Sequence, residues 1–396
     1  MKKMFSMMLA LALSLSFTAC DAGLGAKQPS NDGAGNDAPA GSTGNSGSGE
    51  TTPAPVSGED VPGFGVSYRS GDPAADLNAS VTSTEKITWI VANCTTETNP
   101  QATALAAMAE ELSTLTNGNF TLDIFYNSEL GSEMEAVELC RNNTVQMVTS
   151  NVTNMATYQE NCGVFALPYL FHSSDDMLEY LATSPIAYDM WEQLEENTGL
   201  VTLGFQCGGS RCLSTKGVKT ASSPDGLKGI KVRSMDAVVW QDVISALGAT
   251  PVPVAYTELY TALQTSVVQG QDNPAGNTVD GKFYEVLDTF YETEHCYLIS
   301  AFYSNSDAWD SLPDDYKSVL LGLFQKYQGN QFQADMTAFT ENCYTVMKDA
   351  GMTIVSQDEL DMDAFYASAS EMIDSKYKSN AVYSEIISDV TATFGY

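Results

Sequence analysis

Positive charge and histidine are scarce in this chain of 396 residues. It has 18 Lys plus Arg against 50 Asp plus Glu, it has two histidines, and its formal net charge is −32. Phosphate recognition needs a basic surface, so this balance excludes a nucleic-acid-binding protein, and anionic membranes repel the chain as well. Any site for an anion must be built locally, against the field of the whole protein.

Sequence motifs for enzymatic chemistry are missing too. The chain has no nucleophile elbow, phosphate-binding loop, dinucleotide fingerprint or histidine-rich zinc motif. His295 falls in a strand-like run and is predicted to pack there or to line a cleft, not to act as a base. The acidic residues Asp358, Asp361 and Asp363 lack the Gly and terminal Glu of an EF-hand loop and fit an acidic first helical turn. The sequence predicts no catalytic residue, cofactor or metal site.

The cysteines indicate neither a disulfide framework nor a zinc site. Eight are present, and the seven that follow residue 20 are an odd number with no CxxC or zinc spacing. Buried free thiols are therefore expected. Only Cys207 and Cys212 lie close enough in sequence to suggest a local bridge, and that alternative stays open.

The N-terminus is typical of an export signal. Residues 1 to 20 combine a basic start, an apolar run from Met4 to Phe17 that is too short to span a bilayer, and a small-residue cleavage site. Residues 17 to 20 resemble a bacterial lipobox, which implies lipid attachment at Cys20. The alternative is an ordinary cleaved signal in which Cys20 is incidental.

Residues 21 to 85 are rich in Gly, Ser and Pro. Such a segment has too little apolar surface to offset the entropy of ordering, so we expect a disordered tether. About 60 residues of this kind have an r.m.s. span of about 40 Å. That length suits a globular domain held off a membrane.

The rest of the chain alternates between strand and helix patterns. Strands are predicted at residues 86–94, 119–126, 145–149, 200–205, 229–233 and 250–254, with helices between them. This alternation is typical of an α/β fold. After Pro313 the helical spacing continues to about residue 350, and a helix longer than about 25 residues more naturally runs across two lobes. Two lobes joined in this way leave a cleft, the usual place for a small-molecule site.

Several separated motifs carry a resemblance to one family. They occupy residues 127–131, 167–171, 225–233, 247–253, 256–265, 270–274 and 308–313. In this order they resemble the solute-binding proteins of tripartite ATP-independent periplasmic (TRAP) transporters, of the DctP type, over about residues 86 to 378. The resemblance implies a two-lobed, periplasmic-binding-protein-like α/β fold with a cleft between the lobes and a long helix spanning both. We expect lobe I at 86–208 plus about 299–335, and lobe II at 209–298 plus about 336–396.

The resemblance also implies a set of ligand-binding residues. Arg233, at the end of the Lys-x-Arg strand, corresponds to the arginine that forms a two-pronged salt bridge with the solute carboxylate. Arg211 corresponds to the family's upstream arginine, Asn273 to its asparagine near the carboxylate, and Tyr256 to the aromatic residue that stacks on the ligand. Independently, a guanidinium fork matches a carboxylate bidentately and keeps its charge. The alternatives are an ion pair for Arg211, a core position for Tyr256 and a turn position for Asn273.

Three further residues are weaker candidates. Thr96, Asn99 and Asn151 fall at predicted βα junctions, where the distal end of a ligand would be contacted.

The function that the resemblance implies is transport. We expect an extracytoplasmic, lipid-anchored, monomeric protein that binds an organic acid, closes its lobes and delivers the acid to the TRAP permease in the membrane, without catalysis. A secreted hydrolase on a similar frame is one alternative, which the missing nucleophile and base argue against. A ligand sensor for a signalling receptor is another, because it would share the same fold and pocket. A carboxylate fork accepts dicarboxylates, sugar acids, keto acids and aromatic acids alike.

Overall fold

A computed structural model describes residues 67–69 and 71–395, and the structural statements below concern these residues. The strands are β1 (Ile87–Ala92), β2 (Phe120–Phe125), β3 (Met147–Asn151), β4 (Leu200–Thr215), β5 (Lys231–Ser234), β6 (Thr250–Pro253), β7 (Gly270–Asn273), β8 (Thr289–Asn305) and β9 (Thr353–Val355). The α-helices are α1 (Pro100–Leu115), α2 (Glu133–Arg141), α3 (Ser174–Thr183), α4 (Pro185–Thr198), α5 (Val238–Ala246), α6 (Tyr256–Gln264), α7 (Ala275–Asp280), α8 (Ser306–Asp310), α9 (Asp314–Gln328), α10 (Asn330–Asp349), α11 (Met362–Met372) and α12 (Ala381–Phe394). Cys20 and the export signal lie outside the described residues.

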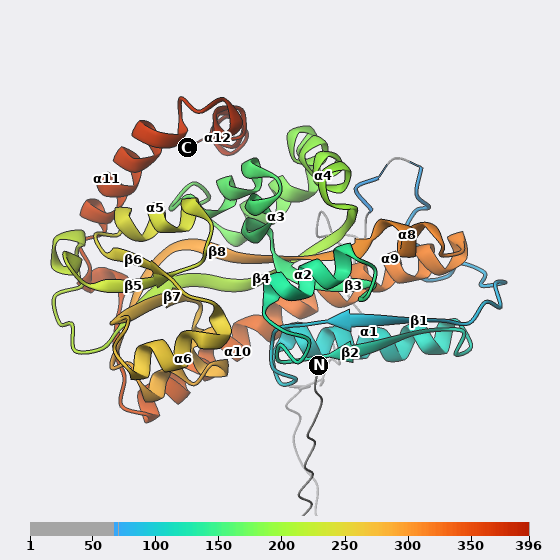
Figure 1. The fold of residues 1–396 in the computed structure, drawn as a ribbon, viewed down its shortest axis with the longest axis horizontal. Helices are drawn as coiled ribbons and strands as arrows, with labels where there is room; N and C mark the ends of the chain where they lie inside the picture. The colour runs from blue at the N-terminus through green and yellow to red at the C-terminus, as the bar shows by residue number, and fades with distance from the viewer. Residues whose placement is uncertain (1–66, 70, 396) are drawn as a thin grey trace, which may run out of the picture. The chain divides into compact units, whose positions relative to one another are not determined.

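The strands form one mixed sheet in the order β2-β1-β3-β8-β4-β7-β5-β6, with β9 paired to β8. Two parallel groups, β2-β1-β3 and β7-β5-β6, stand at either side of the antiparallel pair β4 and β8. These two strands have 16 and 17 residues, so at about 3.4 Å per residue each spans roughly 55 Å. Figure 1 shows them running through the centre of the sheet. β4 and β8 therefore connect the two parallel groups of strands within one sheet.

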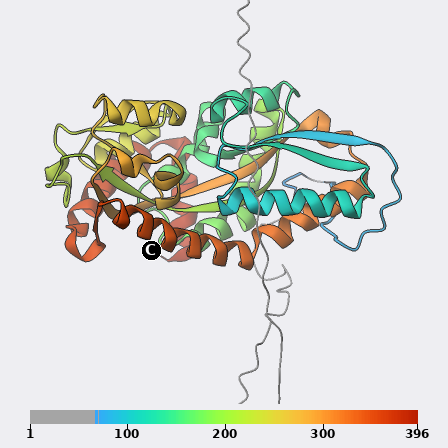
Figure 2. The ribbon, with the colours of Figure 1, turned by 90° about the horizontal axis from the view of Figure 1, so that it is seen from below.

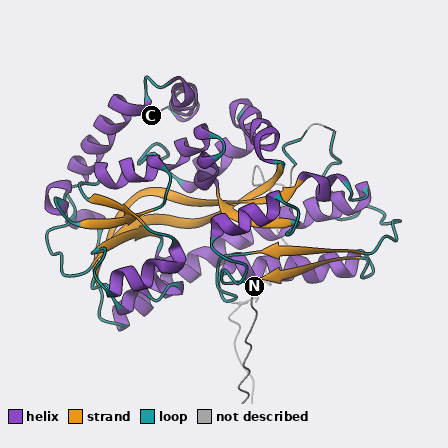
Figure 3. Ribbon diagram, viewed as in Figure 1, coloured by secondary structure: helices purple, strands orange, loops and turns teal. Residues whose placement is uncertain are grey.

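Helices cover both faces of this sheet. In Figures 1 and 3, α3, α4, α5, α11 and α12 lie on one face, and α1, α6 and α10 lie on the other. Among the described residues, a core around Trp89 and Phe324 packs α1 and α9 against β1, and a second core around Leu259 and Phe290 packs α6 near β8. A third and larger core extends along the opposite face, under α3, α4, α5 and α12. Each parallel group therefore has its own packed layer.

Helix ends follow the capping signals in the sequence. The Asn99 side chain accepts a hydrogen bond from the backbone N–H of Gln101, and Pro100 occupies the first turn of α1. Ser132 and Glu135 form a reciprocal capping box at the start of α2. These two helices hold the loops that follow β1 and precede α2 in fixed positions, and both loops contribute to the site.

The helical segment after Pro313 is present, but the chain divides it into α9 and α10. Gly329 separates them with a ψ of −150°, which is extended, and glycine leaves the helical region at little cost because it has no Cβ. Figure 2 shows the two helices following one another across the structure, with α9 in orange and α10 in deeper orange. The prediction that this segment is helical is confirmed, but it forms two consecutive helices and not a single long one.

The predicted tether ends earlier than residue 85. Tyr68 is buried, with its ring centroid 4.8 Å from that of Tyr188 and 5.4 Å from that of Phe205. Further along, the Asp315 carboxylate accepts hydrogen bonds of 2.8 and 2.9 Å from the backbone N–H groups of Thr82 and Ser83. The expectation of disorder is therefore wrong for residues 67–69 and 71–85. We call residues 67–85 the strap, of which residue 70 is not described.

Two negative findings apply to the described residues. No helix there is long and apolar enough to cross a membrane. The seven cysteines from Cys94 to Cys343 are all free, and six of them are buried, as expected for packed thiols. Cys207 and Cys212 form no bridge.

Candidate functional site

A cavity of about 220 Å³ is lined by residues from both parallel groups of strands. Its walls come from residues that follow the carboxyl ends of β1, β3, β5, β6 and β7, and from the start of α2. In α/β sheets ligands bind outside the carboxyl ends of the strands, because the loops there are free of the sheet's own packing. The geometry thus makes this cavity the candidate binding site.

Arg233 supplies positive charge to the cavity from the end of β5. Its neighbour Val232 is fully buried, and Arg233 itself is only 3% exposed. Its Nε donates a 2.8 Å hydrogen bond to the backbone oxygen of Val254, which fixes the guanidinium next to the cavity. Among the described residues, no carboxylate lies within 4.0 Å of this guanidinium. A buried cation without an anionic partner is a site for an anionic ligand.

Burial changes the acidity of this group without removing its charge. Desolvation lowers the pKa of the Arg233 guanidinium to about 10; the nearby Asp272 carboxylate acts against this decrease, and the nearby Arg211 charge adds to it. A pKa of about 10 still leaves the group protonated near neutral pH. The low-polarity surroundings make the charge costly in the free protein and strengthen its attraction for an anion.

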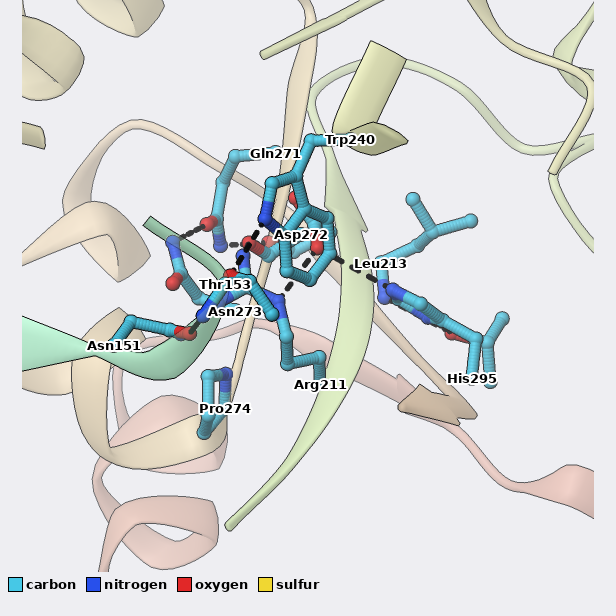
Figure 4. Close-up of polar contacts among 12 residues, drawn as sticks. Asn151, Thr153, Arg211, Leu213, Trp240, Gln271, Asp272, Asn273, Pro274 and His295 are labelled. Carbon is cyan, nitrogen blue, oxygen red and sulfur yellow. Dashed lines mark hydrogen bonds and ion pairs between the residues drawn. The ribbon is translucent and has the colours of Figure 1, made fainter. Parts of the chain in front are cut away.

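Arg211 also lines the cavity, but its charge already has a partner. Arg211 is 1% exposed, its Nε donates a 2.8 Å hydrogen bond to Asp272, and its guanidinium lies 4.5 Å from the ring centroid of Trp240. Figure 4 shows this network, with Arg211 on β4 and Asp272 on β7. Although burial acts to raise it, the Arg211 charge and a hydrogen bond from His295 lower the pKa of Asp272 to about 2. Asp272 is therefore ionised and compensates Arg211.

His295 belongs to the same buried network. Its Nε2 lies 3.3 Å from Asp272 and its Nδ1 lies 3.0 Å from the Thr293 hydroxyl. Burial lowers the pKa of the His295 ring, against the opposing effect of Asp272. Both ring nitrogens are occupied and the side chain is fully buried, so the structural prediction for His295 as a packed residue is confirmed.

Asn273 and Tyr256 both line the cavity. The Asn273 amide donates to the Gln271 side chain, which in turn donates a 2.6 Å hydrogen bond to Ser214. An amide nitrogen carries two hydrogens, so one remains for a ligand. The Tyr256 hydroxyl donates to the backbone oxygen of Asn277 at 3.0 Å, which fixes the ring at the cavity wall.

The three weaker candidates have different positions. Asn151 and Thr96 line the cavity, and the Asn151 amide nitrogen is buried with no hydrogen-bond partner among the described residues. Its Oδ1 accepts from Thr153, as Figure 4 shows, so the amide is oriented with the nitrogen unpaired. Asn99 does not line the cavity. It caps α1, and its side-chain amide donates a 2.8 Å hydrogen bond to Asp280, which does line the cavity.

Sequence reasoning did not identify four carboxylates in or beside the cavity, which are Asp272, Glu133, Asp236 and Asp280. Asp272 directly precedes Asn273 within the motif at residues 270–274, and its role depends on its pairing with Arg211, 61 positions away. Glu133 and Asp280 line the cavity from the start of α2 and the end of α7. Glu133 follows the motif at 127–131 by two residues, and this proximity is the feature of the sequence that could have identified it as a residue of the site.

Comparisons with known proteins agree with this architecture. The family model of the bacterial extracellular solute-binding proteins, family 7 (DctP), matches residues 91–380. The chain belongs to that family. The family 7 assignment confirms the prediction of a TRAP-type solute-binding protein.

Individual relatives of this family 7 protein cover most of its length. It is 32% identical over 252 residues to the C4-dicarboxylate-binding periplasmic protein DctP of Rhodobacter capsulatus, covering 63% of this chain and 74% of that protein. A TRAP periplasmic solute-binding protein of Chromohalobacter salexigens, solved with D-glucuronate, has a TM-score of 0.71 at 24% identity and covers 77% of this chain and 99% of that one. One of Roseobacter denitrificans, solved with L-galactonate, has a TM-score of 0.69 at 26% identity, with 78% and 99% covered. The two-lobed α/β fold is confirmed.

Proposed function

We propose that this protein binds an organic acid through its carboxylate at Arg233 and delivers it to a TRAP permease in the membrane. The observation that carries the proposal is the buried guanidinium of Arg233, which lines the cavity and has no ion-pair partner within residues 67–69 and 71–395. The names of the relatives support it, because C4-dicarboxylates, D-glucuronate and L-galactonate are all carboxylates.

Delivery requires the site to open and close. Lobe I would comprise 86–208 plus about 299–335, and lobe II 209–298 plus about 336–396, so that β4 and β8 connect the lobes. The pairing of these strands shifts register between Cys207 and Ser210, next to Gly209 with a φ of +105°. A register shift weakens the ladder locally, and a hinge there would let a ligand bridge Arg233 and Asn151 from opposite lobes.

The location is proposed to be the outer side of the cytoplasmic membrane, with lipid on Cys20. The lipobox-like triplet before Cys20 supports this, and family membership supports an extracellular position. The strap would then join the lipid-anchored segment to the folded part at Tyr68. We also propose that the protein acts as a monomer.

We propose no catalytic activity. His295 is the histidine nearest to the site, and its two ring nitrogens are already hydrogen-bonded to Asp272 and Thr293. The cavity lining contains Ser and Thr hydroxyls, but no described histidine lines it to serve as their base. A receptor-linked sensor would share the site, and no observation on the molecule favours it.

A thermal-shift screen tests the proposal. A panel of organic acids is compared with their primary amides, which keep the shape and lose the charge. A ligand at 100 times its Kd stabilises by about 2.7 kcal/mol, so the binding acids should raise the melting temperature and their amides should not. Equal shifts for acid and amide contradict the carboxylate site. Conversion of the acid to a product would favour the hydrolase alternative.

A further inference from the structure

The charged groups that line the cavity are unevenly balanced. They comprise two arginines, Arg211 and Arg233, and three carboxylates, Glu133, Asp236 and Asp280, and no described lysine or histidine is in the lining. Asp272 compensates Arg211. Arg233 is the cation of the lining that has no ion-pair partner among the described residues, although Asp272 and Glu133 lie near enough to act on its charge, and a ligand carboxylate would pair with it. A second carboxylate on the ligand would lie near the carboxylates of the lining, with no further unpaired arginine or lysine among the described lining residues to bind it.

Glu133 presents an acceptor to the cavity. Its Oε1 accepts hydrogen bonds from the Ser150 hydroxyl at 2.9 Å and from the backbone N–H of Asn151, which anchors the carboxylate. Its Oε2 has no donor among the described residues. A ligand group opposite this oxygen must donate a hydrogen bond, which a hydroxyl can do and a carboxylate cannot.

Asp280 presents a second, separately held carboxylate. Its Oδ1 accepts from the Thr96 hydroxyl at 3.0 Å and its Oδ2 from the Asn99 amide at 2.8 Å. Burial raises the pKa of Asp280, since its surroundings disfavour negative charge even on a carboxylate with two donors. Another anion beside it would meet the same unfavourable environment and a like charge as well.

We propose that the cavity accepts a monocarboxylate whose remaining carbons carry hydroxyl groups, and that Glu133 and Asp280 select against dicarboxylates. This inference rests on the proposed function of the same site. Asn, Gln, Ser and Thr side chains line much of the remaining wall, and they can donate and accept, as ligand hydroxyls do.

The size of the cavity indicates which acids to test first. A cavity of about 150 Å³ holds benzene, with its six carbon atoms. In proportion, about 220 Å³ holds roughly nine non-hydrogen atoms, the size of a four-carbon hydroxy acid such as threonate. Six-carbon acids test whether an opening of the lobes admits more.

The test compares acids that differ in a single terminal group. Threonate and tartrate of matching configuration share a carboxylate and hydroxyls and differ by a terminal CH₂OH or COO⁻; galactonate and galactarate do the same with six carbons. Calorimetric titration at one pH and ionic strength should show at least about 10-fold tighter binding of the monocarboxylate, equivalent to about 1.4 kcal/mol. Glu133→Gln and Asp280→Asn should each reduce that ratio several-fold, chiefly by improving dicarboxylate binding.

Glu129→Gln is the matched control, because Glu129 is exposed, lies in the loop before α2 and does not line the cavity. It removes the same charge and should leave the ratio unchanged. The proposal is overturned by equal or tighter dicarboxylate binding to the unaltered protein, or by folded Glu133→Gln and Asp280→Asn variants that keep its ratio. It is also overturned when only acids without hydroxyls bind. Absence of binding by every carboxylate, or binding that Arg233→Met leaves intact, refutes the proposed function itself.

Discussion

Replacing Arg233 with Met should abolish ligand binding without harming the free protein. Met approximates the volume of the arginine stem and removes the charge. Arg233 is buried, and its guanidinium has one hydrogen bond, to Val254, and no carboxylate partner among the described residues. Removing a buried charge that lacks an ion-pair partner relieves a desolvation cost, so the ligand-free melting temperature should stay the same or rise.

The effect on affinity should have the opposite sign. Truncating one partner of a buried, hydrogen-bonded charge pair costs about 2 to 5 kcal/mol, which is a loss of roughly 30-fold to several thousand-fold in Kd. Arg233→Lys keeps the charge, but a lysine cannot present two parallel N–H donors to a carboxylate. Its affinity should fall between those of the unaltered protein and Arg233→Met.

The assay is calorimetric titration with the tightest-binding acid of the screen, after circular dichroism and thermal unfolding establish that each variant is folded. Arg141→Met is the control, because Arg141 lies on the surface of α2, paired to Glu138 and stacked 4.5 Å from the ring centroid of Tyr158. It removes the same charge outside the cavity and should leave affinity within about twofold. Unchanged affinity in folded Arg233→Met, or an equal loss in Arg141→Met, refutes the reasoning.

Three further predictions follow from other parts of the molecule. The folded-state pKa of Asp272 is lowered to about 2, so the stability that its ionised form contributes is complete above the unfolded pKa of about 4 and is lost as the pH falls through 2. Denaturant titrations at a series of pH values should show this decrease in the free energy of unfolding. Asp272→Asn should remove the pH dependence and should cost about 3 to 5 kcal/mol. Tyr68→Ala should cost about 3 kcal/mol in thermal unfolding, whereas deletion of residues 1–66 should cost little; equal effects would contradict a packed strap. Labelled palmitate should enter the unaltered protein and not Cys20→Ser, and labelling of both would contradict the lipid anchor.

Local signals in the sequence were sufficient for several of the elements and for one residue of the candidate site, but not for the full length of β4 or for β7 and β9. Asn99 and Pro100 mark the start of α1 because capping depends on residues adjacent in the chain. Arg233 could be placed at the cavity because a basic residue at the end of a buried strand faces the sheet edge where ligands bind. Both conclusions need only a few neighbouring residues.

Contacts between residues far apart in the sequence could not be predicted from such local signals. Arg211 and Asp272 are brought together by the pairing of β4 with β7, so nothing near either residue shows that the charge of Arg211 is compensated. The strap was missed for a similar reason: its sequence has a tether's composition, and Tyr68 is ordered by rings more than 100 positions away. Composition describes what a segment can bury alone, and tertiary contacts supply the rest.

An acidic protein can bind an acid when a nearby positive charge attracts the ligand more strongly than the net negative charge of the whole protein repels it. Two unit charges about 4 Å apart attract by about 4 kcal/mol at an effective dielectric constant of about 20. A surface charge about 20 Å away in water acts with about 0.2 kcal/mol, which 0.1 M salt reduces to about 0.03 kcal/mol, so an excess of 32 negative charges opposes binding by about 1 kcal/mol in total. Arg233 therefore dominates because it is buried and has no ion-pair partner among the described residues, and Arg211, which is already paired to Asp272, cannot replace it.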